Sequence, residues 1–162
     1  MKIGILSDTH DNLNAVREAC DLFAAEGITT LLHCGDVCGP AVVEALNGFT
    51  VYFAQGNQER ILALREAVVA LQGGRLAPMH ILTLSGRSIA LLHGDDGHTL
   101  RHLMTSGMYA YVIHGHTHRH RDEWYGPTRV INPGALGGIR WEPPSVCTLD
   151  LDTDEVNFYI IS

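Results

Sequence analysis

The first half of the chain repeats one pattern three times: a short apolar strand, a polar turn and an amphipathic helix. The pattern predicts strands at 2–7, 29–34 and 50–54, followed by helices at 13–26, 41–46 and 60–71. Strands that alternate with helices in this way favour a parallel sheet with right-handed crossovers. Sites in such sheets form beyond the carboxyl ends of the strands, and all three polar turns fall there.

The second half of the chain is richer in predicted strands, four of which are expected to form two hairpins. We expect one helix near 99–105 and strands at 79–84, 88–92, 110–113, 121–125, 129–131, 145–151 and 156–160. The two halves together predict an α/β architecture of two sheets face to face, with helices outside. A length of 162 residues suits one domain with a real core, so we expect a single domain spanning 1–162.

Composition argues against two classes of partner. The formal net charge is −7 and Lys2 is the single lysine, which disfavours binding to polymeric nucleic acid. No apolar run approaches the roughly 18 residues that a membrane span requires. The apolar stretch after Lys2 is too short for a signal-peptide core, so a cytoplasmic location is expected.

The cysteines are expected to be free thiols, as in other cytosolic chains: Cys20, Cys34, Cys38 and Cys147. Cys34 and Cys38 flank Gly35-Asp36 and raise the alternative of a structural zinc site. No second cysteine pair completes such a site, so small buried thiols are the favoured interpretation.

Short motifs with metal-binding side chains follow five of the expected strands. In chain order they are Asp8-x-His10, Gly35-Asp36, Gly56-Asn57, His93-Gly94 and Gly115-His116-x-His118. Each motif alone has an ordinary explanation: a surface pair, a turn at Gly56-Asn57, or a buried histidine at His93. Together they supply two carboxylates and several neutral ligands. Two divalent ions with these ligands and a bridging hydroxide would keep a net positive charge, which attracts a phosphodiester.

In this order the motifs closely resemble those of the calcineurin-like metallophosphoesterase family. The chain length and the sequence Asn132-Pro133-Gly134 are similar to its small single-domain branch, the YfcE-like phosphodiesterases. The resemblance implies a four-layer αββα sandwich of two mixed β-sheets flanked by helices. It also implies a cytoplasmic hydrolase of small phosphate esters, and relatives of this kind are often homo-oligomers.

The resemblance implies a ligand set for each of two metal ions. Asp8, His10, Asp36 and His118 would hold the first ion, and Asp36, Asn57, His93 and His116 the second. The metals would be manganese, with iron, nickel or zinc as alternatives. A hydroxide bridging the ions would attack phosphorus in line with the leaving group, which makes Asp36, Asn57 and His93 the expected catalytic residues.

The chain departs from the family pattern at two positions near the expected site. Gln58 stands where relatives carry His or Cys, and an amide cannot give up a proton to a leaving group. Asp95 follows His93-Gly94 where the branch often has His. We expect both near the substrate, where Asp95 would either hydrogen-bond a sugar hydroxyl or face solvent. His98 is a candidate for leaving-group protonation and Arg140 a candidate phosphate contact, although Arg140 also fits a solvated loop.

Two further histidines next to the ligands, His33 and His114, are expected to be buried groups that orient them. Three alternatives to a phosphodiesterase remain open at this point: a phosphomonoesterase, a non-catalytic scaffold of the same fold such as the retromer subunit, and a metal-sensing or storage protein.

Overall fold

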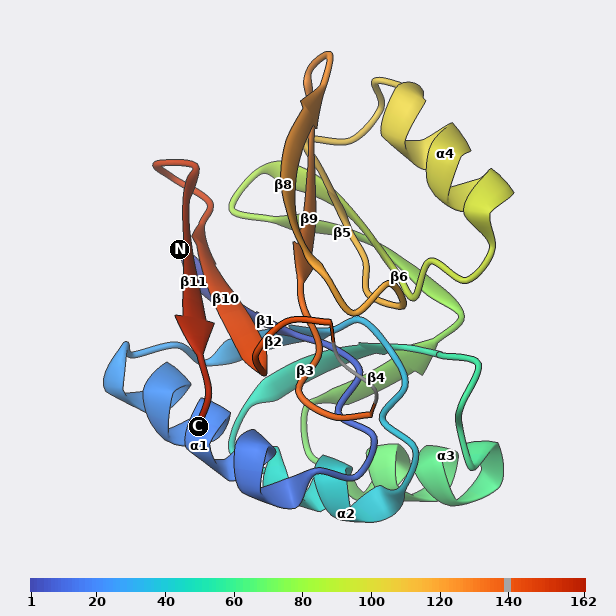
Figure 1. Ribbon diagram of the computed structural model, residues 1–162, viewed down its shortest axis with the longest axis vertical. Helices are drawn as coiled ribbons and strands as arrows, with labels where there is room; N and C mark the ends of the chain where they lie inside the picture. Colours follow the sequence, from blue (N-terminus) through green and yellow to red (C-terminus); the bar gives the residue numbers. More distant parts are fainter. Residues whose placement is uncertain (139–140) are drawn as a thin grey trace.

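Parallel strands that alternate with helices build the first of two sheets in the computed structural model, which describes residues 1–138 and 141–162 (Figure 1). This sheet has six strands in the order β11-β10-β1-β2-β3-β4, and β1 to β4 run parallel. Its strands are β1 (Lys2–Leu6), β2 (Thr30–His33), β3 (Thr50–Ala54), β4 (Gly74–Ala77), β10 (Ser145–Asp150) and β11 (Glu155–Ile160). Strand β10 pairs antiparallel with both β1 and β11, so the sheet is mixed.

The second sheet contains five strands in the order β5-β6-β7-β9-β8. They are β5 (Met79–Leu84), β6 (Arg87–Leu92), β7 (Tyr111–Ile113), β8 (His120–Tyr125) and β9 (Thr128–Pro133). The three central strands β6, β7 and β9 run parallel, whereas the hairpin partners β5 and β8 form antiparallel edges. This sheet is therefore mixed as well.

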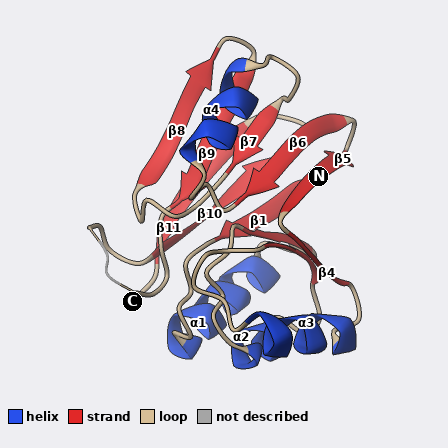
Figure 2. Ribbon diagram, turned by 90° about the vertical axis from the view of Figure 1, so that its right-hand side faces the viewer, coloured by secondary structure: helices blue, strands red, loops and turns tan. Residues whose placement is uncertain are grey.

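The four helices of the described chain cover the outer faces of the two sheets (Figure 2). Helices α1 (Leu13–Ala25), α2 (Pro40–Ala45) and α3 (Ile61–Ala70) lie together on one side, and α4 (Gly97–Thr105) lies on the other. The local sequence explains where α1 begins and ends. The Asn12 side chain accepts the Ala15 N–H at its start, and Gly27, at φ +69°, turns the chain away after its end.

Three apolar clusters fill the spaces between the four layers. One joins α1–α3 to the six-stranded sheet through residues such as Phe23 and Phe53. A second lies between the sheets and includes Ile5 and Tyr111. A smaller third cluster, with Leu103, fixes α4 to the five-stranded sheet. The expected four-layer αββα sandwich is confirmed, with both of its sheets mixed.

The structure corrects three details of the predicted elements. Residues 74–77 form an edge strand, β4. The sequence did not predict this strand because it follows Gly73-Gly74 and lacks a clear alternation of apolar and polar residues. Helix α4 begins two residues early, at Gly97, because the Asp96 carboxylate accepts the N–H groups of His98 and Thr99. Strand β9 runs through Asn132 and Pro133 rather than ending at Ile131.

None of the described helices has both the length and the apolar character that crossing a bilayer requires.

Candidate metal centre

The seven candidate ligands come from the segments that follow β1, β2, β3, β6 and β7, so both sheets contribute to one place. Ligand atoms of four of them lie within 4.8 Å of one another: Asp8, His10, Asp36 and His118. His10 Nε2 lies 3.9 Å from Asp8 Oδ1 and 3.5 Å from Asp36 Oδ2. His118 Nε2 lies 3.1 Å from Asp8 Oδ1.

The remaining three candidates gather on the other side of Asp36. His93 Nε2 lies 2.9 Å from Asn57 Oδ1, 3.2 Å from His116 Nδ1 and 3.4 Å from Asp36 Oδ1. The two carboxylate oxygens of Asp36 therefore contact different groups. Oδ2 approaches His10, while Oδ1 approaches His93 and accepts the Gln58 N–H at 2.8 Å.

The polarity of these atoms fits a bound cation. His93 Nδ1 lies 2.8 Å from the carbonyl of Cys34 and donates to it, so a ring without a second proton would present a lone pair at Nε2. That lone pair meets the amide oxygen of Asn57 and a carboxylate oxygen of Asp36, which are also acceptors. His10 Nε2 is likewise buried with no hydrogen-bond partner, beside two carboxylates. Acceptors that face one another without a proton need a positive ion between them.

Cys38 orients the ring of His10. Its Sγ lies 3.4 Å from His10 Nδ1 and 3.9 Å from the carbonyl oxygen of Asp36. Burial raises the pKa of Cys38 to about 12, so the thiol keeps its proton. The S–H can donate to the Asp36 carbonyl while Sγ accepts from His10 Nδ1–H, which leaves Nε2 free to bind a metal. The interpretation of Cys38 as a simple buried thiol was incomplete, and the two-residue spacing from Asp36 was the available signal.

Asp8 is held in its ionised form. Burial alone would raise the pKa of the Asp8 carboxyl, but hydrogen bonds from His118 and Ser7 outweigh burial and lower it. The backbone N–H of His116 also reaches Asp8 Oδ2, at 3.1 Å. An ionised, fully buried carboxylate is well suited to binding a divalent cation.

The backbone at the centre is strained. Five of the candidate ligands have a positive φ: Asp8, His10, Asp36, His116 and His118. A non-glycine residue in this left-handed region is uncommon, and strain of this kind costs about 1–3 kcal/mol and collects at functional sites. Gly56 and Gly115 allow the segments to approach closely, because a Cβ at either position would collide with Asp36 or Asp8 respectively.

Glu59 fastens two of the ligand-bearing segments together. Its carboxylate accepts the N–H groups of Val37 at 3.2 Å, Cys38 at 2.7 Å and Gly56 at 3.0 Å. Glu59 was not among the residues predicted from the sequence. The available signal was an acidic residue two positions after Asn57.

The expected orienting histidines are buried, as predicted. His33 accepts the Gly35 N–H at Nδ1, and its Nε2 lies 3.2 Å from Thr9 Oγ1. Burial lowers the pKa of His33 to about 3 and that of His114 to about 4. Both rings are therefore neutral near pH 7.

The expected substrate contacts show no common pattern. The backbone of Gln58 is fixed by Asp36, but its side chain is exposed. Asp95 is exposed and lines a cavity of about 220 Å³ together with His93. His98 is exposed on the first turn of α4, where its backbone N–H binds Asp96. Arg140 lies outside the described residues.

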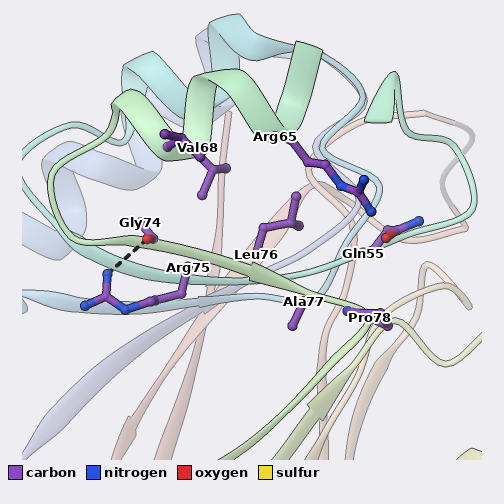
Figure 3. A pocket seen from close by; sticks show the side chains of 9 residues that line it. Gln55, Arg65, Val68, Gly74, Arg75, Leu76, Ala77 and Pro78 are labelled. Carbon is purple, nitrogen blue, oxygen red and sulfur yellow. Dashed lines mark hydrogen bonds between the residues drawn. The ribbon is translucent and has the colours of Figure 1, made fainter. Parts of the chain in front are cut away.

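A separate cavity of about 390 Å³ lies between α3 and β4 (Figure 3). Its walls carry the apolar side chains of Val68 and Leu76, with Arg65 and Gln55 near one end. None of the seven candidate ligands lines this cavity. The cavity therefore reaches Gln55, two residues before Asn57, but is not part of the ligand cluster.

Residues 1–154 match the family model of the calcineurin-like phosphoesterase superfamily domain. The chain therefore belongs to the calcineurin-like phosphoesterase family, as the motifs indicated. It is 32% identical over 159 residues to phosphodiesterase MJ0936 of Methanocaldococcus jannaschii, and this alignment covers 96% of each chain.

Solved structures agree with this assignment. The fold is similar to that of a structure described as a novel archaeal phosphodiesterase, with a TM-score of 0.92 and 30% identity over 99% of this chain and 100% of that one. It is also similar to Yfce, a phosphoesterase from E. coli, with a TM-score of 0.72 and 25% identity over 100% of both chains.

Proposed function

We propose that this protein is a metal-dependent phosphodiesterase that hydrolyses a small organic or nucleotide phosphodiester at a two-metal centre. The observation that carries the proposal is the position of Asp36, whose two oxygens approach His10 on one side and His93 on the other. A carboxylate placed in this way is suited to bridging two ions. Family membership and the phosphodiesterase relative support the same reaction class.

The proposed ligand sets follow the two groups of contacts. Asp8, His10, Asp36 and His118 would hold one ion, and Asp36, Asn57, His93 and His116 would hold the other. Oxygen and imidazole ligands suit manganese, with iron, nickel and zinc as alternatives. When bound, the two ions lower the pKa of water so that a hydroxide nucleophile exists near neutral pH, and they neutralise charge on the phosphoryl oxygens.

The protein's own residues prepare this site for an anionic substrate. Asp8 and Asp36 supply two negative charges, and the imidazoles bind in their neutral form, so a site with two divalent ions keeps a positive charge. Cys38 and the carbonyl of Cys34 fix the tautomers of His10 and His93. The exposed side chains of Asn57 and Gln58 lie at the open side, where a substrate would enter.

The wider proposal includes a single domain over 1–162 and a cytoplasmic location. The cysteines of the described chain are all free thiols, which supports a reducing compartment. A homo-oligomer, as in many relatives, is part of the same proposal. The partner is a small phosphate ester rather than polymeric nucleic acid, because the chain is acidic.

A direct assay tests the proposal. The purified protein is incubated with bis-p-nitrophenyl phosphate and with p-nitrophenyl phosphate, first with manganese and then with a chelator. Manganese-dependent release of p-nitrophenol that is faster from the diester is the expected result. Faster turnover of the monoester would identify a phosphomonoesterase. Metal binding without turnover of either substrate would favour a scaffold or a metal-sensing role.

A further inference from the structure

The two histidines after β7 project from one very tight turn. The Thr117 N–H donates to the Gly115 carbonyl at 2.8 Å, and His116 between them has a φ of +67°. A three-residue hydrogen bond with a positive central φ defines the rarer and more strained kind of γ-turn. The turn sends His116 toward His93, while His118 reaches Asp8.

The side-chain amide of Asn132 connects the two ends of this turn. Asn132 is fully buried near the end of β9. Its Nδ2 donates to the Gly115 carbonyl at 2.9 Å and to Thr117 Oγ1 at 3.0 Å. Its Oδ1 accepts the Gly134 N–H at 3.0 Å. Both donor hydrogens and the acceptor are therefore used, and the two donors bind on either side of His116.

Gly134 extends the connection to the other ligand segment. It begins a loop in which Leu136 N–H donates to the Ser7 carbonyl at 3.1 Å and Gly137 N–H donates to the Asp8 carbonyl at 2.8 Å. Asn132 thus joins the turn that carries His116 to the loop that packs on the segment of Asp8. The amide has no charge of its own and reaches no candidate ligand side chain with its donors.

We propose that Asn132 is a positioning residue that holds the strained turn, keeps His116 and His118 pointing in different directions, and so sets the affinity for the ion that His116 would hold. This inference rests on the proposed two-metal centre. Without Asn132 the turn would relax and His116 would no longer point toward His93. Metal binding would then have to restore the strained turn, and the free energy of that strain would be subtracted from the binding free energy. Partners behind metal ligands typically contribute about 10–100-fold to affinity.

The principal test replaces Asn132 with aspartate, which has the same shape but has no donor hydrogen when ionised and only one when protonated, so at least one of the two hydrogen bonds is lost. Manganese binding is measured by calorimetry on metal-free protein, and cobalt binding is measured by visible absorption. We expect Asn132→Asp to bind the weaker of two ions about 10–100-fold less tightly and to shift the cobalt spectrum. The manganese concentration for half-maximal activity should rise, while kcat at saturating manganese stays within a few fold. Asn47→Asp, an exposed surface change of the same charge, serves as the control.

A second pair of variants covers the case in which Asn132→Asp does not fold. Thr117 is exposed, so Thr117→Val and Thr117→Ser put little of the core at risk. The valine removes the hydroxyl that Asn132 binds and should weaken manganese binding several-fold, whereas the serine keeps the hydroxyl and should match the wild type. If Asn132→Asp and Thr117→Val both fold and bind manganese with wild-type affinity, the role of Asn132 is overturned but the two-metal centre is not. A wild-type protein that binds no manganese or cobalt would overturn the two-metal centre as well.

Discussion

Glu59 and Cys38 are joined by a charge-assisted hydrogen bond in which the carboxylate Oε2 accepts the Cys38 backbone N–H at 2.7 Å. The other oxygen, Oε1, accepts the N–H groups of Val37 and Gly56. One side chain therefore fixes the segment after Asp36 to the segment before Asn57. This third residue therefore holds the segments of Asp36 and Asn57, two of the candidate ligands, at their spacing.

Replacing Glu59 with glutamine should weaken both the fold and the metal centre. The amide keeps one acceptor, but its NH₂ group faces a backbone donor, so at least one N–H loses its partner. We expect a loss of about 1–3 kcal/mol in the free energy of unfolding of the metal-free protein. We also expect about 10–100-fold weaker manganese binding. Urea unfolding in chelator and calorimetric titration measure the two effects. Glu66→Gln, on the exposed side of α3, is the control, and equal behaviour of the two variants would contradict the prediction.

Replacing Asp36 with asparagine should separate metal binding from folding. The amide oxygen can still accept the Gln58 N–H that Oδ1 binds at 2.8 Å, so the metal-free protein should keep its melting temperature within a few degrees. Removing the bridging charge should abolish the rise in melting temperature that manganese gives the wild type. It should also lower turnover of bis-p-nitrophenyl phosphate at least about 100-fold. Thermal melts with chelator and then with manganese give the first result, with the exposed variant Asp21→Asn as the control. A manganese-dependent rise that survives in Asp36→Asn would be inconsistent with a bridging role.

Replacing Gln58 with histidine should change the dependence on the leaving group. The Gln58 side chain is exposed, and its backbone is fixed beside Asp36, so an imidazole at this position would lie near the departing oxygen of a bound ester. An imidazolium can donate a proton, which an amide cannot do near neutral pH. The gain in kcat/KM should therefore be about tenfold or more for alkyl esters and small for p-nitrophenyl esters. Rates for a series of diesters with leaving groups of increasing pKa measure this difference. An equal gain across the series would exclude leaving-group protonation.

Acid should destabilise the metal-free protein through His33. The pKa of this histidine falls from 6.5 to about 3 on folding because the ring is buried. As the pH falls below 6.5, the unfolded chain binds a proton that the folded protein excludes. Stability is therefore complete above pH 6.5 and is lost toward pH 3, at up to about 1.4 kcal/mol per pH unit. His114, whose pKa falls to about 4, adds a loss of the same sign.

Urea unfolding in chelator between pH 7 and pH 4.5 measures this dependence. His33→Gln removes the titrating group, so its stability should be lower at pH 7 but should fall less steeply as the pH decreases. The exposed His98→Gln should retain the wild-type slope. A wild-type slope in His33→Gln would show that other groups govern the loss.

The sequence predicted the layers of the fold because its strands and helices have strong periodic patterns. Strand β4 was missed because Gly74 and Arg75 interrupt the apolar pattern, and the strand forms only because β3 offers it an edge. The start of α4 depended on the cap at Asp96, which periodicity does not reveal.

The candidate ligands were predictable because each follows a strand in a recurring motif. The groups behind them were harder to find. Glu59 and Asn132 act through backbone N–H and C=O groups of distant segments, and a sequence alone does not show which segments meet. Cys38 was visible but looked like an ordinary buried thiol, since its contact with His10 joins residues 28 positions apart.

The division of the donors between the two sheets has a consequence for how the protein assembles. Asp8, His10, Asp36 and Asn57 follow strands of one sheet, whereas His93, His116 and His118 follow strands of the other. A chain that has built only one sheet presents an incomplete set of candidate ligands, so the proposed metal ions could bind tightly only after the two sheets dock. The rate at which a refolding chain acquires manganese would then report the docking of its two halves, which fluorescence from Trp124 and Trp141 need not detect.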